Sequence, residues 1–312
     1  NELFYIEYVM EILINGATGL IGRELVKQCN ADGISVHYFT TRKSKIENRS
    51  KYRGFYWNPI ENEIDVAAFE GVSAIINLAG ANIGKRWTKS YKTEILESRT
   101  IPADLIFKTL QKLDHSISHF ISASGISVYP RSETDVYTED TIEVDTSFLA
   151  DIVKAWEASA DPFRSLGMKV SIVRTGMVLA NDGGVFPKLA QTVKLGLGAP
   201  LGTGNQWQSW VHLDDAASIY LHVLTHKLEG IYNAVAPNPV TNRALNKEIA
   251  AHAAAPLWLP KVPSFVLKLM LGEMAILALE GQLVRSKKLE LSGYEFAYPT
   301  IELACADLLS VD

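Results

Sequence analysis

Cysteine is scarce in this chain, which has only Cys29 and Cys305 among its 312 residues. Two cysteines so far apart in the sequence form no disulfide framework, and no C-x-x-C pair indicates a metal or redox site. Such sparing use of cysteine suits a compartment that keeps thiols reduced. We therefore expect a cytoplasmic protein without a bound metal.

Positive charge is also in short supply, because 30 Lys and Arg residues face 35 Asp and Glu, for a net charge of −5. General nucleic-acid-binding proteins are usually basic, so we expect no nucleic-acid partner. Long apolar runs are missing too. The most apolar stretch, residues 263–281, contains Lys268, Glu273 and Glu280, and it predicts two short packed helices rather than a membrane span.

The N-terminus lacks the basic, apolar and small-residue regions of a signal peptide. The first apolar strand begins directly after Met10. We expect Met10 to be the natural start and residues 1–9 to be an extension.

Compact apolar runs alternate with amphipathic stretches along the chain. The expected strands are residues 11–15, 34–40, 73–80, 119–124, 168–176 and 230–237, and the expected helices are 20–31, 89–110, 148–163 and 214–228. Pro102 should kink or break its helix. Strands that are apolar throughout indicate a parallel sheet covered on both faces. The sequence therefore predicts an α/β fold, a Rossmann-type doubly wound parallel sheet.

Three glycines follow the first strand in NGATGLIG (residues 15–22). Such glycines permit a tight turn, close backbone approach to a pyrophosphate and close helix–strand packing, and the helix N-terminus attracts the anion. No G-K-[ST] tripeptide follows, which excludes a phosphate loop of that kind. A glycine-rich turn without a ligand is the alternative. The residues expected to contact a dinucleotide here are Gly16, Thr18, Gly19, Leu20, Ile21 and Gly22.

The second strand ends FTTRKSK (residues 39–45) without an acidic residue. An NAD site normally places Asp or Glu there, on the ribose 2′-hydroxyl. Here Thr41, Arg42 and Lys43 occupy that position, and their positive charge suits a 2′-phosphate. The sequence predicts NADP(H) as the cofactor, with a solvated charged loop as the alternative.

The chain divides into two parts where the regular alternation of strands and helices gives way to a glycine-rich stretch. Residues 10–176 form the expected NADP-binding domain, and residues 177–312 form mainly a substrate-side α+β subdomain. Segments from about residues 205–237 should return to complete the sheet. The glycine-rich stretch 183–210 should cover the substrate side, because glycines permit loop closure. Within it we expect Trp207 to face a ligand and Trp210 to anchor the loop in the core.

Motifs along the whole chain resemble one superfamily. They include NGATGLIG, INLAGANI, ISASGISVY, VRTGMVLANDGG and GLGAPLGTGNQWQSWVHLDD, and they extend from about residue 10 to 310. The sequence resembles the extended short-chain dehydrogenases/reductases and, more narrowly, the atypical epimerase-family proteins of the YfcH type, some of which are labelled SulA-like cell-division inhibitors. The resemblance implies a Rossmann fold, NADP binding and a C-terminal substrate subdomain.

The resemblance also implies roles for single residues. On the cofactor side it places Leu78, Ala79, Gly80, Arg99 and Ser122. For Arg99 a buried ion pair is the alternative. Ser124, at the end of HFISAS, is the expected hydroxyl that polarises a substrate oxygen, and a serine that merely caps a turn is the alternative.

The superfamily's usual catalytic pair is missing. Relatives use Tyr-x-x-x-Lys on the following helix, where the tyrosine is the acid/base and the lysine lowers its pKa. In FLADIVKAWE these positions fall on Leu149 and Val153, or in the other register on Ala150 and Lys154. None of the 12 tyrosines is followed by a lysine four residues later.

Three residues are candidates to replace that pair. Tyr129 follows the Ser124 strand, Lys154 could keep a ribose contact, and His212 has an unperturbed pKa near 6.5. The alternatives are Tyr129 packed in a loop, Lys154 on a solvated helix face and His212 bonded to a backbone carbonyl.

Other acidic and histidine residues favour structural interpretations. Asp214 and Asp215 begin a helix and are expected to cap it rather than to bind a metal. His222 and His226 have zinc-like spacing without a further ligand, so we expect a helix surface.

The leading hypothesis is an NADP(H)-dependent oxidoreductase acting on a small carbonyl or alcohol. The alternative is a non-catalytic NADP(H)-sensing or cell-division-linked binding protein, which the missing Tyr–Lys pair favours. Sugar-nucleotide epimerisation ranks third, because that chemistry needs a strong base and usually tight NAD⁺. The resemblance also implies a homodimer, because members of this superfamily often dimerise through the helices that correspond to residues 89–113 and 148–163.

Overall fold

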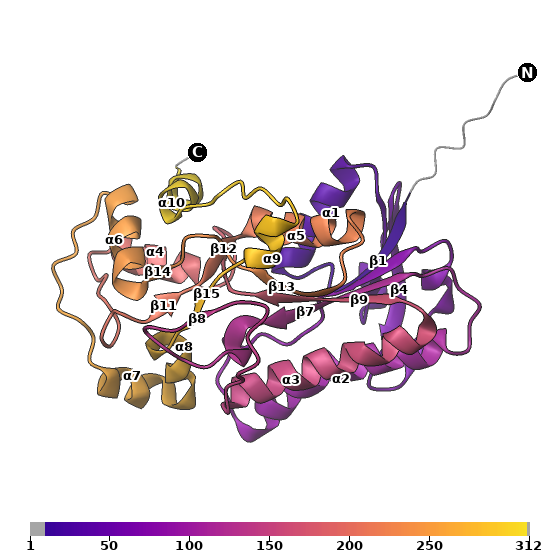
Figure 1. The fold of residues 1–312 in the computed structure, drawn as a ribbon, viewed down its shortest axis with the longest axis horizontal. Coiled ribbons are helices and arrows are strands. Elements are labelled where there is room, and N and C mark those ends of the chain that lie inside the picture. Colours follow the sequence, from indigo (N-terminus) through magenta and orange to yellow (C-terminus); the bar gives the residue numbers. More distant parts are fainter. Residues whose placement is uncertain (1–9, 311–312) are drawn as a thin grey trace, which may run out of the picture.

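The computed structural model describes residues 10–310. Its centre is a sheet in the order β13-β9-β7-β6-β1-β2-β4-β3, with β5 paired to β4 (Figure 1). The expected extension at residues 1–9 lies outside the described residues. The strands of this sheet are β1 (Glu11–Asn15), β2 (Ser35–Thr40), β3 (Asn48–Arg49), β4 (Tyr52–Asn58), β5 (Glu63–Ile64), β6 (Ala74–Asn77), β7 (His119–Gly125), β9 (Lys169–Thr175) and β13 (Gly230–Ala234).

Seven strands of the sheet, from β13 to β4, pair in parallel. Helices cover both faces, with α1 and α5 together on one and α2 and α3 side by side on the other (Figure 1). The long helices are α1 (Leu20–Ala31), α2 (Lys89–Leu110), α3 (Phe148–Ala160) and α5 (Leu213–Thr225). This arrangement confirms the predicted doubly wound α/β fold.

The alternation of side chains in β1 explains why both faces need cover. Ile12 and Ile14 belong to the core under α1 and α5, whereas Leu13 belongs to the core under α2. All three side chains are fully buried. Successive residues of a strand point to opposite faces, so a strand that is apolar at every position must be covered twice.

Two features of the sheet region differ from the sequence prediction. Helix α2 continues through Pro102, so of the expected kink or break the break is wrong, and the kink stays a prediction. A proline removes one helical hydrogen bond, and the buried residues Ala103 and Ile106 that follow hold the helix on the sheet. Strand β4 was not anticipated, because Arg53 and Gly54 interrupt its apolar run.

The C-terminal part surrounds the carboxyl ends of the sheet strands with short elements (Figure 1, left). Three small two-stranded pairings link them, and β13 rejoins the main sheet beside β9. The short strands are β8 (Val136–Tyr137), β10 (Met177–Leu179), β11 (Trp207–Gln208), β12 (Trp210–His212), β14 (Val240–Thr241) and β15 (Leu283–Val284). The helices are α4 (Phe186–Lys194), α6 (Asn242–His252), α7 (Ser264–Leu271), α8 (Ile276–Leu279), α9 (Lys287–Leu291) and α10 (Ile301–Leu309).

The apolar stretch at 263–281 forms α7 and α8, joined by the 3₁₀ turn η5 (Gly272–Ala275). The prediction of two short helices is therefore confirmed. Within residues 10–310, no helix combines the length and the apolarity needed to cross a bilayer.

Candidate functional site

The glycine turn brings the ends of β1 and β6 into close contact. Gly16 has φ +86°, and a Cβ there would lie 2.9 Å from the carbonyl carbon of Leu78. A Cβ on Gly22 would lie 2.2 Å from the Gly16 oxygen. These positions therefore require glycine, as a turn that packs a helix against a strand end does.

The first turn of α1 is open to an anion. Gly19 caps the helix without a side-chain hydrogen bond, and no acidic residue occurs in the first turn. Its free backbone N–H groups point toward the carboxyl edge of the sheet, where the helix dipole favours negative charge. Thr18 is exposed in the turn, and Leu20 and Ile21 line a large cavity.

The basic residues after β2 lie where the sequence analysis placed them. Thr41, Arg42 and Lys43 are exposed directly beyond the strand end. The Arg42 N–H donates to the hydroxyl of Thr40, and the Lys43 ammonium lies 4.7 Å from the ring centre of Tyr56. Within the described chain neither Arg42 nor Lys43 forms an ion pair, so both charges are available to a phosphate.

Arg99 is a buried cation without a carboxylate partner among residues 10–310. Its guanidinium donates to the carbonyls of Ile95 (2.8 Å) and Ala81 (3.2 Å) and lies 4.7 Å from the Trp156 ring centre. Burial lowers the pKa of Arg99 to about 10. The alternative of a buried ion pair is therefore wrong. The guanidinium lines the cavity, and some of its N–H donors remain available to a ligand.

The backbone after β6 makes room for this guanidinium. A Cβ on Gly80 would lie 2.9 Å from the Arg99 Cζ atom. Leu78 donates its N–H to the carbonyl of Asn15, which places Leu78, Ala79 and Gly80 beside the glycine turn. Strand ends β1 and β6, the α1 N-terminus and Arg99 thus form one continuous surface.

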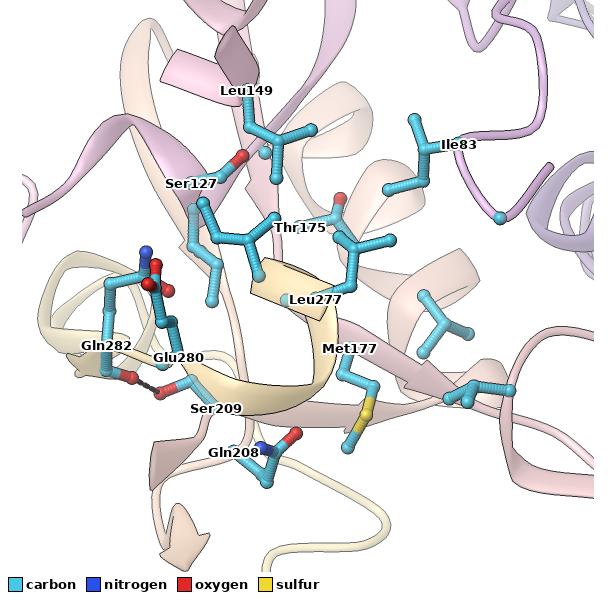
Figure 2. A pocket seen from close by; sticks show the side chains of 18 of the residues that line it. Ile83, Ser127, Leu149, Thr175, Met177, Gln208, Ser209, Leu277, Glu280 and Gln282 are labelled. Atoms are coloured by element: carbon cyan, nitrogen blue, oxygen red, sulfur yellow. Dashed lines mark hydrogen bonds between the residues drawn. The ribbon is translucent and has the colours of Figure 1, made fainter. Parts of the chain in front are cut away.

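The cavity has a volume of about 760 Å³ and opens beside this surface. Figure 2 shows Leu149 of α3, Met177 of β10 and Leu277 of α8 around it. Ser124 and Thr175, at the ends of β7 and β9, also line it. Ligands of open parallel sheets bind at the carboxyl ends of the strands, so this cavity is the candidate site.

Ser124 is hydrogen-bonded to a carboxylate that the sequence analysis missed. Its hydroxyl donates to Glu157 Oε1 at 2.6 Å. Arg174 of β9 holds the same carboxylate with Nε at 2.7 Å from Oε1 and Nη2 at 2.8 Å from Oε2. Desolvation alone would lower the pKa of Arg174, but its hydrogen bonds and charge interaction with Glu157 outweigh this and raise the pKa. With its proton directed at Glu157, the Ser124 oxygen has lone pairs free to accept a hydrogen bond.

Glu157 lies on the same face of α3 as two residues that line the cavity. Leu149, Val153 and Glu157 are spaced four residues apart and therefore share one helix face. Leu149 and Val153, the pair that one of the two registers puts at the usual tyrosine and lysine positions, line the cavity. This four-residue spacing was the one signal in the sequence that could have identified Glu157. The ion pair between Glu157 and Arg174 joins a helix to a strand and could not be predicted from a local pattern.

Tyr129 does not reach the cavity. Its side chain is fully buried, its hydroxyl donates to Asn233 Oδ1 at 2.9 Å, and it accepts from Arg174 Nη1 at 2.9 Å. Burial raises the pKa of Tyr129, although its interactions with Arg174 and Asn233 oppose this. The ring stacks on Tyr137, so the structure favours the packed alternative.

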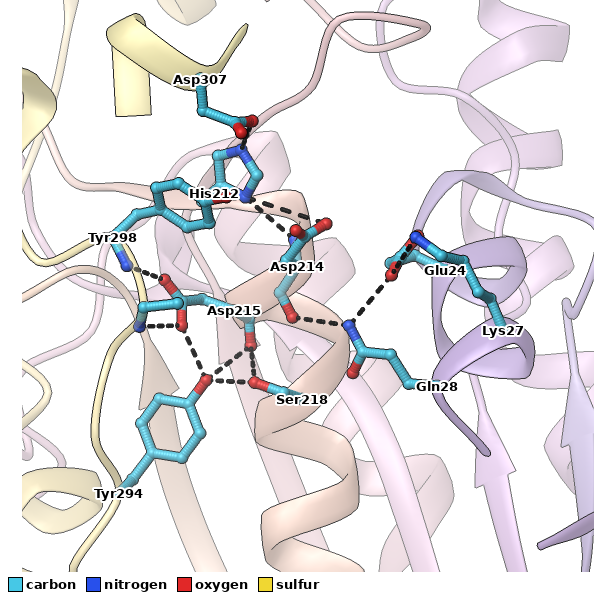
Figure 3. A network of polar contacts seen from close by, with 11 residues as sticks. Glu24, Lys27, Gln28, His212, Asp214, Asp215, Ser218, Tyr294, Tyr298 and Asp307 are labelled. Atoms are coloured by element: carbon cyan, nitrogen blue, oxygen red, sulfur yellow. Dashed lines mark hydrogen bonds and ion pairs between the residues drawn. The ribbon is translucent and has the colours of Figure 1, made fainter. Parts of the chain in front are cut away.

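His212 also lies away from the cavity, in the polar network of Figure 3. It caps α5, because its Nδ1 accepts from the Asp214 N–H at 3.1 Å. Its Nε2 lies 3.2 Å from Asp307 Oδ2, and its ring stacks on Tyr298. The ring thus joins the start of α5 to α10.

The expectation that Asp214 and Asp215 cap this helix is wrong, because the His212 ring already accepts the N–H that a capping carboxylate would take. Asp215 is buried and accepts from the N–H groups of Ala297 and Tyr298. It therefore fastens the C-terminal segment to α5.

Other candidates take structural positions. Lys154 is exposed and pairs with Asp151 at 2.6 Å, which matches its solvated alternative. Ser122 is buried and donates to the Ala123 carbonyl. Trp207 lines the cavity, and Trp210 is fully buried, which confirms its anchoring role.

The histidine pair on α5 shows no metal-site geometry. His222 lies 2.9 Å from the Ser292 hydroxyl, and His226 is exposed. In residues 10–310, no group of His, Cys, Asp and Glu side chains could hold a metal ion.

The sheet, the glycine turn and the cavity at the strand ends define a Rossmann-type nucleotide-binding protein. A sequence profile of the NAD dependent epimerase/dehydratase family matches residues 12–234, and the chain belongs to that family. A second profile, of a domain of unknown function (DUF1731), matches residues 262–308. These matches confirm the resemblance predicted from the motifs.

Relatives match over nearly the whole chain. Epimerase family protein SSP1921 of Staphylococcus saprophyticus is 35% identical over 95% of this chain and 98% of its own length. The chloroplastic SDR39U1 homolog of Arabidopsis thaliana is 34% identical over 95% of this chain and 86% of its own. Because that relative is chloroplastic, a cytoplasmic location for this chain stays a prediction.

A solved structure shares the fold at similar identity. The crystal structure of human epimerase family protein SDR39U1 (isoform 2) with NADPH has a TM-score of 0.84 and 30% identity, and it covers 96% of this chain and 99% of that chain. The C-terminal elements therefore belong to the shared architecture together with the sheet.

Proposed function

We propose that this protein is an NADP(H)-dependent oxidoreductase acting on a small carbonyl or alcohol. One observation carries the proposal: a single cavity joins Leu20 and Ile21, at the dinucleotide turn, to the Ser124 hydroxyl. A family fold alone would not specify a reaction. A cavity that links a cofactor surface to a polarised hydroxyl supports group transfer between cofactor and substrate.

The residues present fit NADP(H). Gly16 and Gly22 let the turn pack tightly against the neighbouring backbone, where a Cβ would collide, and the open start of α1 suits a pyrophosphate. Arg42 and Lys43 offer unpaired positive charge for a 2′-phosphate, and Arg99 offers buried donors beside Gly80. That the human relative was crystallised with NADPH supports the same cofactor. When bound, NADP(H) would supply or accept a hydride.

Ser124 and Glu157 would handle the substrate proton. In alcohol oxidation the substrate hydroxyl proton would pass to the Ser124 oxygen while the Ser124 hydrogen passes to the Glu157 carboxylate across 2.6 Å. In carbonyl reduction the same two transfers would run in reverse, from Glu157 through Ser124 to the new hydroxyl. Arg174 fixes the carboxylate by donating to both of its oxygens, including Oε1, which also accepts from Ser124. Ser124 is thus the candidate catalytic residue, and Glu157 is a positioning residue that acts through it.

A second candidate function is an NADP(H)-sensing binding protein, including one linked to cell division. The observation that favours it is that aliphatic side chains, Leu149 and Val153, line the cavity on the helix that usually carries the catalytic pair. Sugar-nucleotide epimerisation ranks below both, because that chemistry needs a strong base and usually tight NAD⁺.

Two measurements on the purified protein separate these functions. Fluorescence titration with NADPH and NADH tests the cofactor, and we expect much tighter binding of NADPH. Oxidation of NADPH with a panel of aldehydes and ketones tests turnover, with Ser124→Ala as the matched variant. Turnover that Ser124→Ala abolishes supports the oxidoreductase. Tight NADPH binding with no turnover on any compound favours the sensor, and epimer formed from a UDP-sugar would overturn both.

A further inference from the structure

The C-terminal segments give the cavity a predominantly apolar wall. This wall, called here the apolar wall, consists of Leu201, Trp207, Leu245, Leu271, Met274, Ile276, Leu277 and Ala278. Leu149, Ile152 and Val153 of α3 line the same cavity. Pockets of this composition bind largely apolar ligands and orient them with a few polar groups.

We propose that the substrate is an uncharged carbonyl or alcohol with a hydrocarbon portion that lies against the apolar wall, and that it is not a nucleotide diphosphate. This inference rests on the proposed function and specifies its substrate class. The substrate's oxygen would lie at Ser124 and its hydrocarbon portion along α8.

The charges around the cavity support an uncharged substrate. Its lining contains three cations, Arg99, Arg131 and Lys188. Arg131 is already paired with Glu280, and its Nε lies 3.5 Å from Asp145. Because Glu280 and Asp145 also line the cavity, this cluster carries a net negative charge and would repel a diphosphate.

The two other cations lie away from the apolar wall along the chain. Arg99 belongs to α2 and contacts the backbone after β6, where the cofactor is expected. Lys188 is exposed on α4. No cation of the lining comes from the segments that form the apolar wall. A diphosphate held against the apolar wall would lose hydration there, and the wall residues themselves supply no positive charge.

Three polar side chains near the apolar wall already have partners. Ser209 Oγ donates to the Gln282 carbonyl at 2.7 Å, and Gln282 Nε2 donates to the Tyr129 carbonyl at 3.3 Å. Asn242 Oδ1 accepts from the Leu201 N–H at 2.9 Å. These bonds stabilise the wall itself and occupy part of the hydrogen-bonding capacity of Ser209, Gln282 and Asn242.

The rim of the cavity is apolar as well. Leu271 and Leu277 line the cavity and are 39% and 37% exposed. On the same segment Phe265, Leu269 and Met270 are 72%, 86% and 74% exposed. Exposed apolar side chains at a cavity often mark a binding surface, and a substrate with a hydrocarbon portion would cover the rim leucines.

Binding of an uncharged fluorescent probe, N-phenyl-1-naphthylamine, tests the proposal without any turnover. Linear alcohols from butanol to decanol should displace the probe, each added methylene tightening binding about twofold to fourfold. UDP-glucose and ADP-ribose should not displace it from the NADPH-loaded protein. Displacement by UDP-glucose, or alcohol affinities that do not change with chain length, would overturn the proposal.

Variants locate the binding. Leu277→Glu places a charge on the apolar wall and should weaken probe binding about tenfold or more. Leu269→Glu is the matched control, since Leu269 is exposed and does not line the cavity, and it should bind the probe like the parent. If Leu277→Glu fails to fold, Leu271→Gln replaces it. Equal weakening in the control and wall variants would refute the proposal.

In these experiments, different results would refute the proposed function and the proposed substrate class. Alcohol binding that increases with chain length, without NADPH oxidation by the matching aldehydes, would refute the oxidoreductase and keep the apolar binding site. NADPH oxidation by short polar carbonyls without alcohol binding would refute the apolar site and keep the oxidoreductase.

Discussion

Ser124 donates its hydroxyl hydrogen to Glu157 across 2.6 Å, at the point where the sheet meets the cavity. Arg174 binds both oxygens of the same carboxylate through two hydrogen bonds. Hydrogen bonds to a charged group are about twice as strong as neutral ones. The serine oxygen is therefore held in one orientation, with its lone pairs toward a substrate, although the usual tyrosine and lysine are missing.

Removing the Ser124 hydroxyl should affect turnover much more than stability. Ser124→Ala should lower turnover about 100-fold or more, because it removes the only described hydroxyl held at this carboxylate. The variant leaves the Glu157–Arg174 pair intact and should lose only about 2 kcal/mol of unfolding free energy. Steady-state kinetics and urea denaturation measure the two effects. An active variant would exclude Ser124 from the chemistry.

Replacing the carboxylate should affect folding more. Glu157→Gln leaves the buried guanidinium of Arg174 without a counter-charge, which should cost about 3 kcal/mol of unfolding free energy. Lys154→Ala, on the exposed side of α3, is the control and should cost less than about 0.5 kcal/mol. Urea denaturation of both variants checks this. A Glu157→Gln protein as stable as the parent would show that the pair contributes no net stability.

The cofactor preference depends on two exposed side chains. Arg42→Asp combined with Lys43→Ala should weaken NADPH binding about tenfold or more, because a carboxylate then meets the 2′-phosphate. NADH binding should improve relative to NADPH. Lys45→Ala, on the same short turn, serves as the control. Fluorescence titration measures all three, and an unchanged NADPH preference would contradict the proposed phosphate site.

The glycine turn tolerates no side chain at its helix position. Gly22→Ala would place a Cβ 2.2 Å from the Gly16 oxygen, so it should cost about 3 kcal/mol or more and abolish dinucleotide binding. Gly167→Ala is the control: its φ is +77° with nothing within 4 Å, so it should cost about 1–2 kcal/mol. Thermal unfolding and NADPH titration distinguish them. A loss in Gly22→Ala no larger than that in Gly167→Ala would contradict the role of crowding at Gly22.

The fold and the glycine turn could be predicted because their signals are local. Apolar runs such as the one around Leu13 define buried strands, and Gly16 and Gly22 act within a few residues of each other. Arg42 and Lys43 follow a strand end directly, so their position was also readable.

The rest of the site depends on contacts between distant segments. Glu157 and Arg174 come from a helix and a strand, and no local pattern pairs them. The burial of Tyr129 depends on Asn233, 104 residues away. The apolar wall is contributed by segments after residue 200, whose leucines look like ordinary core residues until the cavity is seen. Sequence patterns identify elements well and long-range side-chain partners poorly.

His119 makes stability depend on pH. Its ring is buried next to the Ser171 hydroxyl at 2.7 Å, and burial, together with the charge of Lys169, lowers the pKa of His119 to about 4. The unfolded chain binds this proton near pH 6.5, so the unfolded state holds more protons between pH 6.5 and 4. His119 should therefore favour folding above pH 6.5, and this contribution should fall progressively as the pH is lowered toward 4.

The loss attributable to His119 should be on the order of 2 kcal/mol. His119→Gln cannot take up this proton, so the pH dependence of its unfolding free energy should be shallower than that of the parent over the same window. Urea denaturation at several pH values from 7 to 4 measures the difference, in which the titration of carboxylates common to both proteins cancels. Parallel pH profiles would mean that the folded protein lets His119 gain its proton as readily as the unfolded chain does.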